Sequence, residues 1–386
     1  MPRALQLGLF YCAVFVGTGV SLPYMPLWFK AHGLTGAQIG LILAAPMLAR
    51  IVVTPAMAVW ADGFVLRRSP IILFGLAAGL FYALIGATQG FWIWLVCWVA
   101  AASCLSTVIP LADVLAMKRA RLEGFNYGHA RGLGSVAFVA ANVGMGALLA
   151  WVRPDLILIW TAVAAAGAGV AARFLLPPDP VHEGGERPGR RDRWRGISDL
   201  VRNRPFMLAV VATGLIQATH AFYYAFSALA WKAQGLPENL TGLLWGVGVA
   251  VEVAFLWFGA RVQRRLGPRN LLIIGGVAGV LRWSLLALSP PLWALVPLQA
   301  LHALTYSAVF LASIQLAARL SGPQTASAAQ LVNAALQGGI LSGLATLASG
   351  PLFDAVGAHG YLAMTGMAAA GLVGALGLYR VRRLQD

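Results

Sequence analysis

The chain has 386 residues, of which 59% are hydrophobic and only 11% are charged, whereas about 25% of residues are charged in a soluble protein. This composition excludes a soluble globular domain and predicts a protein that crosses a lipid bilayer many times. The net charge of +15 would suit nucleic acid. However, no basic segment is interleaved with stacking aromatic residues outside the apolar runs, so nucleic acid is not expected as a partner.

Taken in chain order, twelve apolar runs are each long enough to cross a bilayer, which requires about 20 residues. The runs cover residues 4–29, 36–60, 70–88, 91–117, 129–152, 155–176, 205–231, 238–260, 270–288, 291–318, 326–350 and 360–379. The first run is long enough to be retained as a span. The sequence therefore predicts an all-α membrane protein with twelve transmembrane helices.

The longest polar stretch, "PPDPVHEGGERPGRRDRWRGISDLVRNR" at 177–204, separates six runs from six. Its Pro, Gly and Arg content is typical of a linker. We therefore expect an N-terminal six-helix bundle at 1–176 and a C-terminal one at 205–386. Two such halves are typical of pseudo-symmetric secondary transporters, which bind substrate near the bilayer midplane. A tight basic turn in each half, "WADGFVLRRSP" at 60–70 and "RVQRRLGPRN" at 261–270, supports the repeat.

Positive charges are distributed unequally between the two sides of the predicted membrane. With the N-terminus inside, the cytoplasmic segments hold 22 Lys and Arg residues and the opposite segments hold three. This asymmetry predicts a multi-pass protein of the cytoplasmic (inner) membrane with both termini in the cytoplasm. The sequence contains no P-loop and no metal-ligand motif, so we expect neither an enzyme nor an ATP-driven pump, and no cofactor or metal. A monomer is expected, with a small-molecule substrate, protons and the lipid bilayer as its partners.

Ionisable residues inside the predicted spans are functional candidates, because they face the bundle interior and require partners. They are Arg50, Asp113, Arg131, Glu252 and Arg282. The midpoint between Asp113 and Arg131 is residue 122, close to the centre of the turn 118–128, so two antiparallel helices are expected to carry them at a similar depth and allow an ion pair. The pair is either purely structural or a substrate-binding pair that offers bidentate hydrogen bonds.

Polar residues recur at helical spacing on three spans of the second half. The three stripes are Gln217, His220 and Tyr224; Gln299, His302 and Tyr306; and Gln330, Asn333 and Gln337. One stripe alone can serve interhelical hydrogen bonding, but three together favour a lined cavity. Glu252, in the run 238–260, is the only second-half carboxylate assigned to the interior of a predicted span, and a carboxyl group beside a movable Arg or His can take up and release a proton. The alternative is a permanent bridge from Glu252 to Arg282 or His302.

These segments resemble the major facilitator superfamily, in the proton-symporter branch of lactose permease and the nucleoside and phenylpropionate transporters. "WADGFVLRR" is similar to the loop signature of the superfamily, with Asp62 and Arg67 in place and Val65 where a glycine is expected. "YGHARGLGSVAFV" is the most specific match: Arg131 stands where lactose permease has its sugar-binding arginine, and Asp113 where it has the acidic partner. The resemblance implies two pseudo-symmetric six-helix bundles, with Asp62 and Arg67 in a cytoplasmic gate loop.

The resemblance also implies coupling residues. "VAVEVAF", "GVLRWSL" and "LQALHAL" match the segments that carry the coupling glutamate, arginine and histidine of that permease, here Glu252, Arg282 and His302. In lactose permease a second glutamate follows the histidine by three residues, and here that position is Thr305. The proton-carrying role therefore falls on Glu252 or Asp113.

The resemblance and the charge balance together suggest a substrate. "LIQATHAFYYAFSALAWKAQG" and "LARIVV" with Arg50 resemble the 3-phenylpropionate transporters more than the sugar permeases. Three arginines against two carboxylates in the spans leave one positive charge, which a substrate anion would compensate. We therefore expect a proton symporter that imports a small aromatic carboxylate by alternating access, with Arg50 meeting the carboxylate unless it snorkels. The expected substrate-binding residues are Arg50, Asp113, Arg131, Phe138, His220, Tyr223 and Tyr224. The alternatives are a symporter of a neutral sugar or nucleoside and a membrane sensor that transports nothing.

Overall fold

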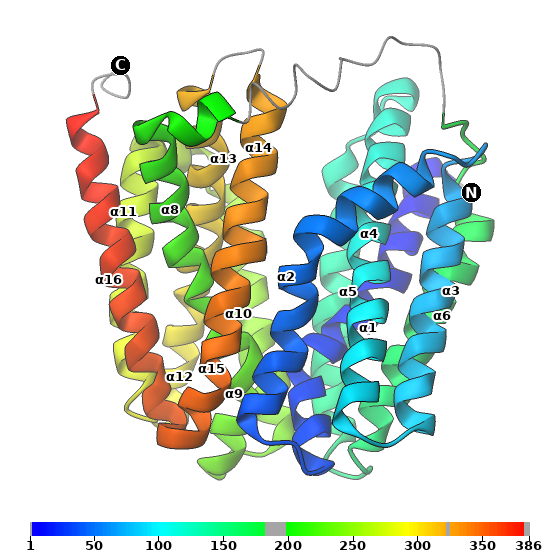
Figure 1. The fold of residues 1–386 in the computed structure, drawn as a ribbon, viewed down its shortest axis with the longest axis horizontal. Helices are drawn as coiled ribbons and strands as arrows, with labels where there is room; N and C mark the ends of the chain where they lie inside the picture. Colours follow the sequence, from blue (N-terminus) through cyan, green and yellow to red (C-terminus); the bar gives the residue numbers. More distant parts are fainter. Residues whose placement is uncertain (1, 182–197, 322–324, 382–386) are drawn as a thin grey trace. The chain divides into compact units, whose positions relative to one another are not determined.

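The computed structural model describes residues 2–181, 198–321 and 325–381. Apart from one isolated bridge, the regular elements of these residues are helices (Figure 1). The all-α prediction is therefore confirmed. Residues 182–197, the larger part of the predicted linker, lie outside the described residues.

The chain divides into two compact units. Unit 1 consists of Met1–Gly185 together with Trp231–Gly246. Unit 2 consists of Glu186–Ala230 together with Val247–Asp386. Each unit thus contains one run of six predicted spans, except that a short segment from the second half of the chain packs with unit 1.

Unit 1 is built from six long helices whose ends are defined by local sequence. They are α1 (Arg3–Ala31), α2 (Gly36–Ala61), α3 (Arg68–Ala87), α4 (Phe91–Glu123), α5 (Tyr127–Leu148) and α6 (Asp155–Leu175). Thr35 and Gln38 form a reciprocal capping box that begins α2. Gly124, at φ 71°, ends α4, and the Asn126 side chain then caps α5, so the tight turn between these two helices forms locally. α1 packs along α5 and α6, and α3 packs along α4 and α6.

The segment Trp231–Gly246 belongs to unit 1 because the first turns of α10 (Glu238–Phe258) lie against α5 and α1. A Cβ atom on Gly242 would lie 2.7 Å from the carbonyl oxygen of Asn142 and 2.7 Å from the hydroxyl oxygen of Tyr24. The Tyr24 hydroxyl donates a hydrogen bond to that carbonyl at 3.0 Å. This close approach leaves room only for glycine at position 242.

Unit 2 is built from shorter helical pieces joined by irregular turns. The α-helices are α8 (Arg204–Ala218), α9 (His220–Ala233) as far as Ala230, the rest of α10, α11 (Ala260–Leu286), α12 (Leu292–Ala300), α13 (Val309–Leu320), α14 (Ala326–Ala334), α15 (Ser342–Val356) and α16 (Tyr361–Gly377). Two π-helical segments, η1 (Ala303–Ala308) and η3 (Ala335–Leu341), and two 3₁₀ turns, η4 (Gly357–Gly360) and η5 (Leu378–Arg380), complete it. π-Helical turns are rare and occur frequently at functional positions, and η1 follows His302 directly.

Eleven helical stretches of the described residues are long and apolar enough to span a membrane. The last stretch, Ala328–Arg380, is 53 residues long and contains two spans. Gly357, at φ 55°, ends α15 and separates it from α16. The prediction of twelve transmembrane helices is therefore confirmed.

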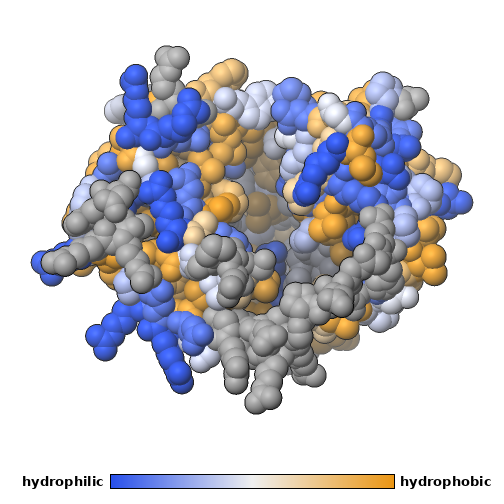
Figure 2. Space-filling model, turned by 90° about the horizontal axis from the view of Figure 1, so that it is seen from above, coloured by the Kyte–Doolittle hydropathy of each residue, from blue (hydrophilic) through white to orange (hydrophobic). Residues whose placement is uncertain are grey.

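The outer surface of the helices is apolar, as contact with lipid requires. Val52 and Val373 expose 74% and 69% of their surface. Near helix ends, Trp92, Trp151 and Trp293 are also exposed, as is typical of side chains at a membrane interface. Figure 2 looks onto the end that is uppermost in Figure 1, where hydrophilic side chains gather on the helix ends and hydrophobic ones show around the flanks.

Small residues allow α3 and α6 to pack closely in unit 1. A Cβ atom on Gly75 would lie 2.5 Å from the Cα atom of Gly169, and one on Gly79 would lie 2.7 Å from the Cβ atom of Ala166. The pair "G75-x-x-x-G79" therefore acts in helix packing, as its spacing predicts.

Replacing Gly169 by Ala is expected to destabilise the protein by about 1–3 kcal/mol, because the added Cβ would overlap backbone atoms of α3 at Leu76 and Ile72. Gly167, two residues earlier on the same helix, has no atom within 4 Å of its Cβ position and provides the matched control. Thermal unfolding of the purified protein in detergent measures both. Equal melting temperatures for Gly169→Ala and Gly167→Ala would contradict the packing described for α3 and α6.

Candidate functional site

In unit 1, Asp113 of α4 and Arg131 of α5 meet across the tight turn between their helices. Arg131 Nε lies 3.8 Å from Asp113 Oδ1. The side chains of Arg131 and Asp113 expose 30% and 26% of their surface. The predicted ion pair is therefore present, and it remains accessible to another molecule.

Three aromatic residues that the sequence did not single out complete this cluster. The Tyr11 and Tyr127 hydroxyls donate hydrogen bonds to Asp113 Oδ1 at 2.6 and 2.9 Å. The Arg131 guanidinium carbon lies 4.2 Å from the ring centroid of Phe15 and 5.2 Å from that of Tyr11. Tyr127, four residues before Arg131, shares its helix face and was detectable from sequence. Tyr11 and Phe15 were not, because nothing local shows that α1 packs against α5.

Two further predicted residues of unit 1 lie apart from this ion pair. Arg50 is exposed on α2, and no ion pair joins it to a carboxylate among the residues that the structure describes. Phe138 is buried where α5 meets α1, and its backbone lies close to Gly19. Their roles in substrate binding stay predictions.

Unit 2 contains a fully buried arginine that is surrounded by neutral acceptors. Arg282 of α11 donates hydrogen bonds to Thr305 Oγ1 at 3.0 Å, to His302 Nδ1 at 3.1 Å and to Gln299 Oε1 at 2.9 Å. Its surface is 0% exposed, and its Nε atom is buried without a hydrogen-bond acceptor among the described residues. The sequence predicted Arg282 and His302 as neighbours, but it gave no indication of Thr305 or Gln299 as partners.

The hydrogen bonds of this cluster assign the tautomers of its two histidines. Because Arg282 can only donate, His302 Nδ1 accepts, and the ring proton resides on Nε2. That Nε2 lies 3.4 Å from Glu252 Oε2 on α10. His220 Nδ1 lies 3.0 Å from the Gln217 carbonyl oxygen and donates to it, so its Nε2 accepts from the Thr305 hydroxyl at 3.0 Å. A continuous chain therefore runs from Glu252 through His302, Arg282 and Thr305 to His220.

Two predicted tyrosines of α9 flank the buried cluster. The Arg282 guanidinium carbon lies 4.9 Å from the ring centroid of Tyr223, which is buried. Tyr224 is partly exposed, and its ring lies 5.7 Å from the His220 ring and 6.4 Å from the His302 ring. Tyr223 therefore stabilises the buried cation through its ring face, whereas Tyr224 presents part of its surface outside the cluster.

The polar stripe at the beginning of the eleventh span does not line a cavity. Gln337 Nε2 donates to Thr213 Oγ1 at 2.7 Å and to Asn333 Oδ1 at 2.6 Å. Asn333 Nδ2 lies 3.4 Å from Ser313 Oγ and donates to it. Both amides are buried. The prediction of a cavity lined by all three stripes is therefore wrong for this stripe, whose side chains join neighbouring helices instead.

The predicted gate loop between α2 and α3 is fixed by residues that follow α6. Arg67 donates from Nε to the Pro180 carbonyl at 3.0 Å and from Nη2 to the Val181 carbonyl at 2.8 Å. The backbone N–H of Arg67 donates to the Asp179 carbonyl at 2.8 Å. Asp62 is exposed at the start of the loop. Arg67 thus ties this loop to the start of the predicted linker, and a role of Asp62 and Arg67 in gating stays a prediction.

Asp179 anchors the same segment to α4. It is only 1% exposed, and Arg119 donates to both of its carboxylate oxygens, while Lys118 Nζ lies 3.6 Å away. Burial alone raises the pKa of a carboxyl group, but the hydrogen bonds and charges of Arg119 and Lys118 outweigh burial and hold the pKa of Asp179 below its usual value. The sequence analysis assigned these residues to a linker and missed this anchor, because its partners are 60 positions apart.

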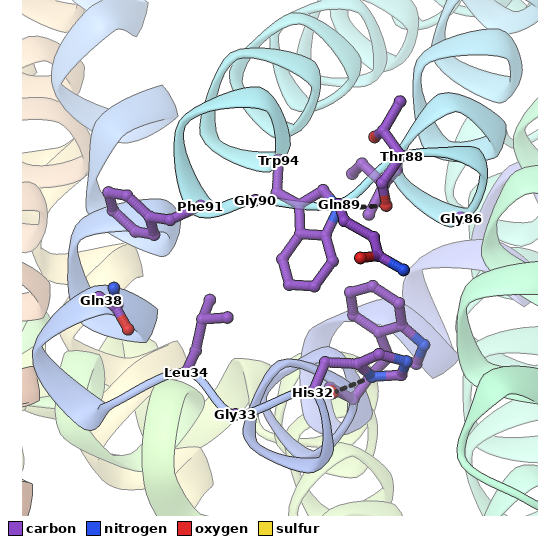
Figure 3. A pocket seen from close by; sticks show the side chains of 12 residues that line it. His32, Gly33, Leu34, Gln38, Gly86, Thr88, Gln89, Gly90, Phe91 and Trp94 are labelled. Atoms are coloured by element: carbon purple, nitrogen blue, oxygen red, sulfur yellow. Dashed lines mark hydrogen bonds between the residues drawn. The ribbon is translucent and has the colours of Figure 1, made fainter.

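A cavity of ≈ 480 Å³ lies at one end of unit 1, away from the predicted site residues. Figure 3 shows Leu34, Phe91 and Trp94 around the space, with His32 at its side. The Trp94 indole N–H donates to the Thr88 carbonyl at 3.0 Å, and His32 Nδ1 donates to the Trp28 carbonyl at 2.9 Å. These two polar groups of the wall are therefore already engaged, whereas the indole N–H of Trp28, which also lines the cavity, is buried without an acceptor among the described residues. Among the described residues, no group of His, Cys, Asp or Glu side chains is arranged to bind a metal.

Comparisons with known proteins identify relatives over nearly the whole chain. The model of the MFS_1 like family matches residues 4–363. The chain is 31% identical to the "Probable 3-phenylpropionic acid transporter" of Escherichia coli K12, over 93% of this chain and 92% of that protein. It is 28% identical to the "Maltose permease" of Geobacillus stearothermophilus, over 90% of this chain and 86% of that one. A crystal structure of a variant of the nucleoside transporter NupG shares the fold, with a TM-score of 0.89 and 14% identity over 98% of this chain and all of that chain.

Replacing Asp179 by Asn is expected to destabilise unit 1 by about 3 kcal/mol near pH 7, because Arg119 and Lys118 lose their counter-ion. The pKa of Asp179 is lowered in the folded protein. Its contribution to stability is therefore complete above the unfolded pKa of about 3.9 and is lost as the pH falls further. Thermal unfolding in detergent should show a constant difference from wild type at neutral pH that shrinks below about pH 4.

Asp199→Asn is the control for this measurement, since Asp199 is an exposed carboxylate near the other end of the predicted linker. The Asp199→Asn variant should have the same melting temperature as the wild type at every pH. A melting curve of Asp179→Asn that coincides with that of Asp199→Asn at pH 7 would contradict the anchor.

Proposed function

The chain belongs to the MFS_1 like family, and we propose from this that it is a proton-coupled symporter that imports a small aromatic carboxylate such as 3-phenylpropionate by alternating access. It is a multi-pass membrane protein of a transporter family, with the twelve-helix fold of the major facilitator superfamily. We further propose that it acts as a monomer in the bacterial inner membrane, with both termini in the cytoplasm, as the asymmetry of its positive charges predicts.

The observation that carries proton coupling is the contact between Glu252 and His302. Glu252 lies on a membrane-spanning helix, and the imidazole that it contacts is bonded on its other side to Arg282. A carboxyl group in an apolar helix whose partner is a neutral imidazole can exist with or without its proton at moderate cost. A fixed bridge to Arg282 would hold it permanently ionised, and none is present among the described ion pairs.

Two observations support an anionic aromatic substrate. The Escherichia coli relative is named a probable 3-phenylpropionic acid transporter, and its similarity extends over 93% of this chain. In addition, two membrane-embedded arginines, Arg50 and Arg282, have no carboxylate within ion-pair distance among the described residues, whereas Arg131 has Asp113. A substrate carboxylate would compensate an arginine of this kind.

A neutral sugar or nucleoside is the second candidate, and the cluster around Asp113 favours it. One carboxylate with two phenols and a guanidinium, all on a partly exposed face, offers donors and acceptors that suit hydroxyl groups. The maltose permease relative supports the same class. A membrane sensor that transports nothing is the third candidate. Uptake of a radiolabelled substrate into vesicles that contain the protein would exclude this candidate.

Glu252→Gln is expected to abolish uphill uptake of 3-phenylpropionate driven by a pH gradient, while exchange of labelled for unlabelled substrate continues. The amide cannot carry a proton, and exchange requires no net proton movement. Both activities are measured in proteoliposomes. Normal uphill uptake by this variant would exclude Glu252 as the proton carrier and leave Asp113 as the candidate.

The charge of the substrate is tested by comparing 3-phenylpropionate with its uncharged amide as competitors of uptake in wild-type proteoliposomes. The loss of a charge-assisted hydrogen bond costs about 1.5–3 kcal/mol, so the amide should compete about 10- to 100-fold more weakly. An amide that competes as well as the acid would reject the anionic substrate and favour the neutral one.

A further inference from the structure

The buried arginine of unit 2 is the membrane-embedded cation that most requires an external counter-ion. Arg131 has a carboxylate at 3.8 Å and two aromatic rings against its guanidinium. Arg50 is exposed on α2, so the protein does not enclose its charge. Arg282 is 0% exposed, its three acceptors are all neutral, and its Nε atom is buried without an acceptor among the described residues.

The hydrogen-bonded cluster around Arg282 approaches the surface of unit 2 through the Nε2–H group of His302. Arg282 occupies His302 Nδ1, so His302 Nε2 must donate, and here it faces Glu252 at 3.4 Å. The Glu252 side chain is 21% exposed, whereas that of His302 is 7% exposed. The carboxylate of Glu252 therefore lies where an acceptor from outside the protein would meet the cluster.

We propose that His302 Nε2–H, with the charge of Arg282 behind it, is the subsite for the carboxylate of the transported anion, and that Glu252 fills this subsite when no anion is bound. The inference rests on the proposed function in that the anion is the transported substrate. When Glu252 takes up a proton from water, it loses the charge that attracts His302 and withdraws, and the substrate carboxylate accepts the same N–H in its place. No covalent bond other than the O–H bond of Glu252 changes.

Counting charges around Glu252 gives the stoichiometry. The groups near it are His302 from the turn after α12, the Ser307 hydroxyl of η1 and Tyr224 of α9. Arg282 of α11 and His220 of α9 lie behind His302. With Glu252 ionised and both rings neutral, the cluster has no net charge. Protonation alone leaves one positive charge in a medium of low dielectric constant, which is costly, and a bound monocarboxylate removes it. One proton and one anion therefore bind together.

Aromatic side chains next to the proposed subsite suit a ring. Tyr224 and Tyr306 are both partly exposed and lie 5.7 and 5.6 Å from the buried His220 ring. Tyr306 is also stacked on His302, with 5.2 Å between ring centroids and 9° between planes. A phenyl group attached to a carboxylate at His302 Nε2 would pack against these rings, which favours an aromatic acid over acetate.

The test measures proton uptake on binding by the purified full-length protein in weakly buffered detergent solution, with 3-phenylpropionate as the probe. The wild type should take up one proton for each anion bound. Its Kd should rise about tenfold for each pH unit once Glu252 is ionised in the free protein. Glu252→Gln should bind the anion with no proton uptake and with a Kd that does not change with pH. Glu238→Gln, on the same helix but paired with Lys232 at its beginning, is the matched control and should behave as the wild type.

Several results would overturn the subsite. The subsite is wrong if the wild type binds 3-phenylpropionate without taking up a proton. It is also wrong if Glu252→Gln takes up a proton on binding. Either result leaves the proposed substrate unaffected. A greater than tenfold loss of affinity in Arg50→Gln, together with unchanged pH dependence in Glu252→Gln, places the carboxylate on α2 instead. If 3-phenylpropionate does not bind at all, the proposed substrate is wrong, and the subsite is then tested with formate and acetate at high concentration. Failure of these anions to bind with proton uptake overturns the subsite as well.

Discussion

An arginine inside an apolar helix must be compensated, and this requirement determines where the chemistry of this transporter lies. The cost of such a charge is at least about 2.5–3.5 kcal/mol when it is left alone in the bilayer. Unit 1 meets the requirement with a carboxylate, since Asp113 faces Arg131 at a partly exposed position. Unit 2 meets it with neutral acceptors and aromatic rings around Arg282, in full burial. The first solution is complete in itself. The second leaves a positive charge that, among the carboxylates of the described residues, Glu252 approaches through His302.

Much of the architecture could be predicted from the sequence, because length and hydropathy alone define a span. The pairing of Asp113 with Arg131 was also predicted, but the assumption of equal distance from the turn was wrong. Asp113 lies ten residues before the end of α4 at Glu123, whereas Arg131 lies four residues after the start of α5 at Tyr127. The remaining partners of Arg131 could not be predicted in this way. Tyr11 and Phe15 come from α1, and only the packing of α1 along α5 brings them to Arg131.

Periodicity on a helix shows that a face is polar, but it does not show what that face contacts. The stripes that contain His302 and Gln337 have the same spacing, and both begin with a glutamine. The stripe with His302 contacts the buried cation of Arg282. In the other stripe, the Gln337 amide donates hydrogen bonds to Thr213 and Asn333. The difference depends on which neighbouring helix carries a charge and which carries a hydroxyl, and this information lies far away in the sequence. A polar stripe in a membrane helix therefore predicts a partner of some kind and not a cavity.

The side chain at position 305 influences the net charge of the cluster around Arg282, and the net charge influences which class of substrate can bind. A glutamate at this position, as the resemblance to lactose permease leads one to expect, would add a second carboxylate to the cluster, which would then hold two acids against the one arginine Arg282. Thr305 instead accepts from Arg282 and donates to His220, which fixes the geometry of the arginine and adds no charge. Under the proposed function, this hydroxyl makes the charge of the site depend on one proton at Glu252. A site built in this way discriminates by ligand charge, because a neutral ligand would leave the buried arginine uncompensated whenever Glu252 is protonated.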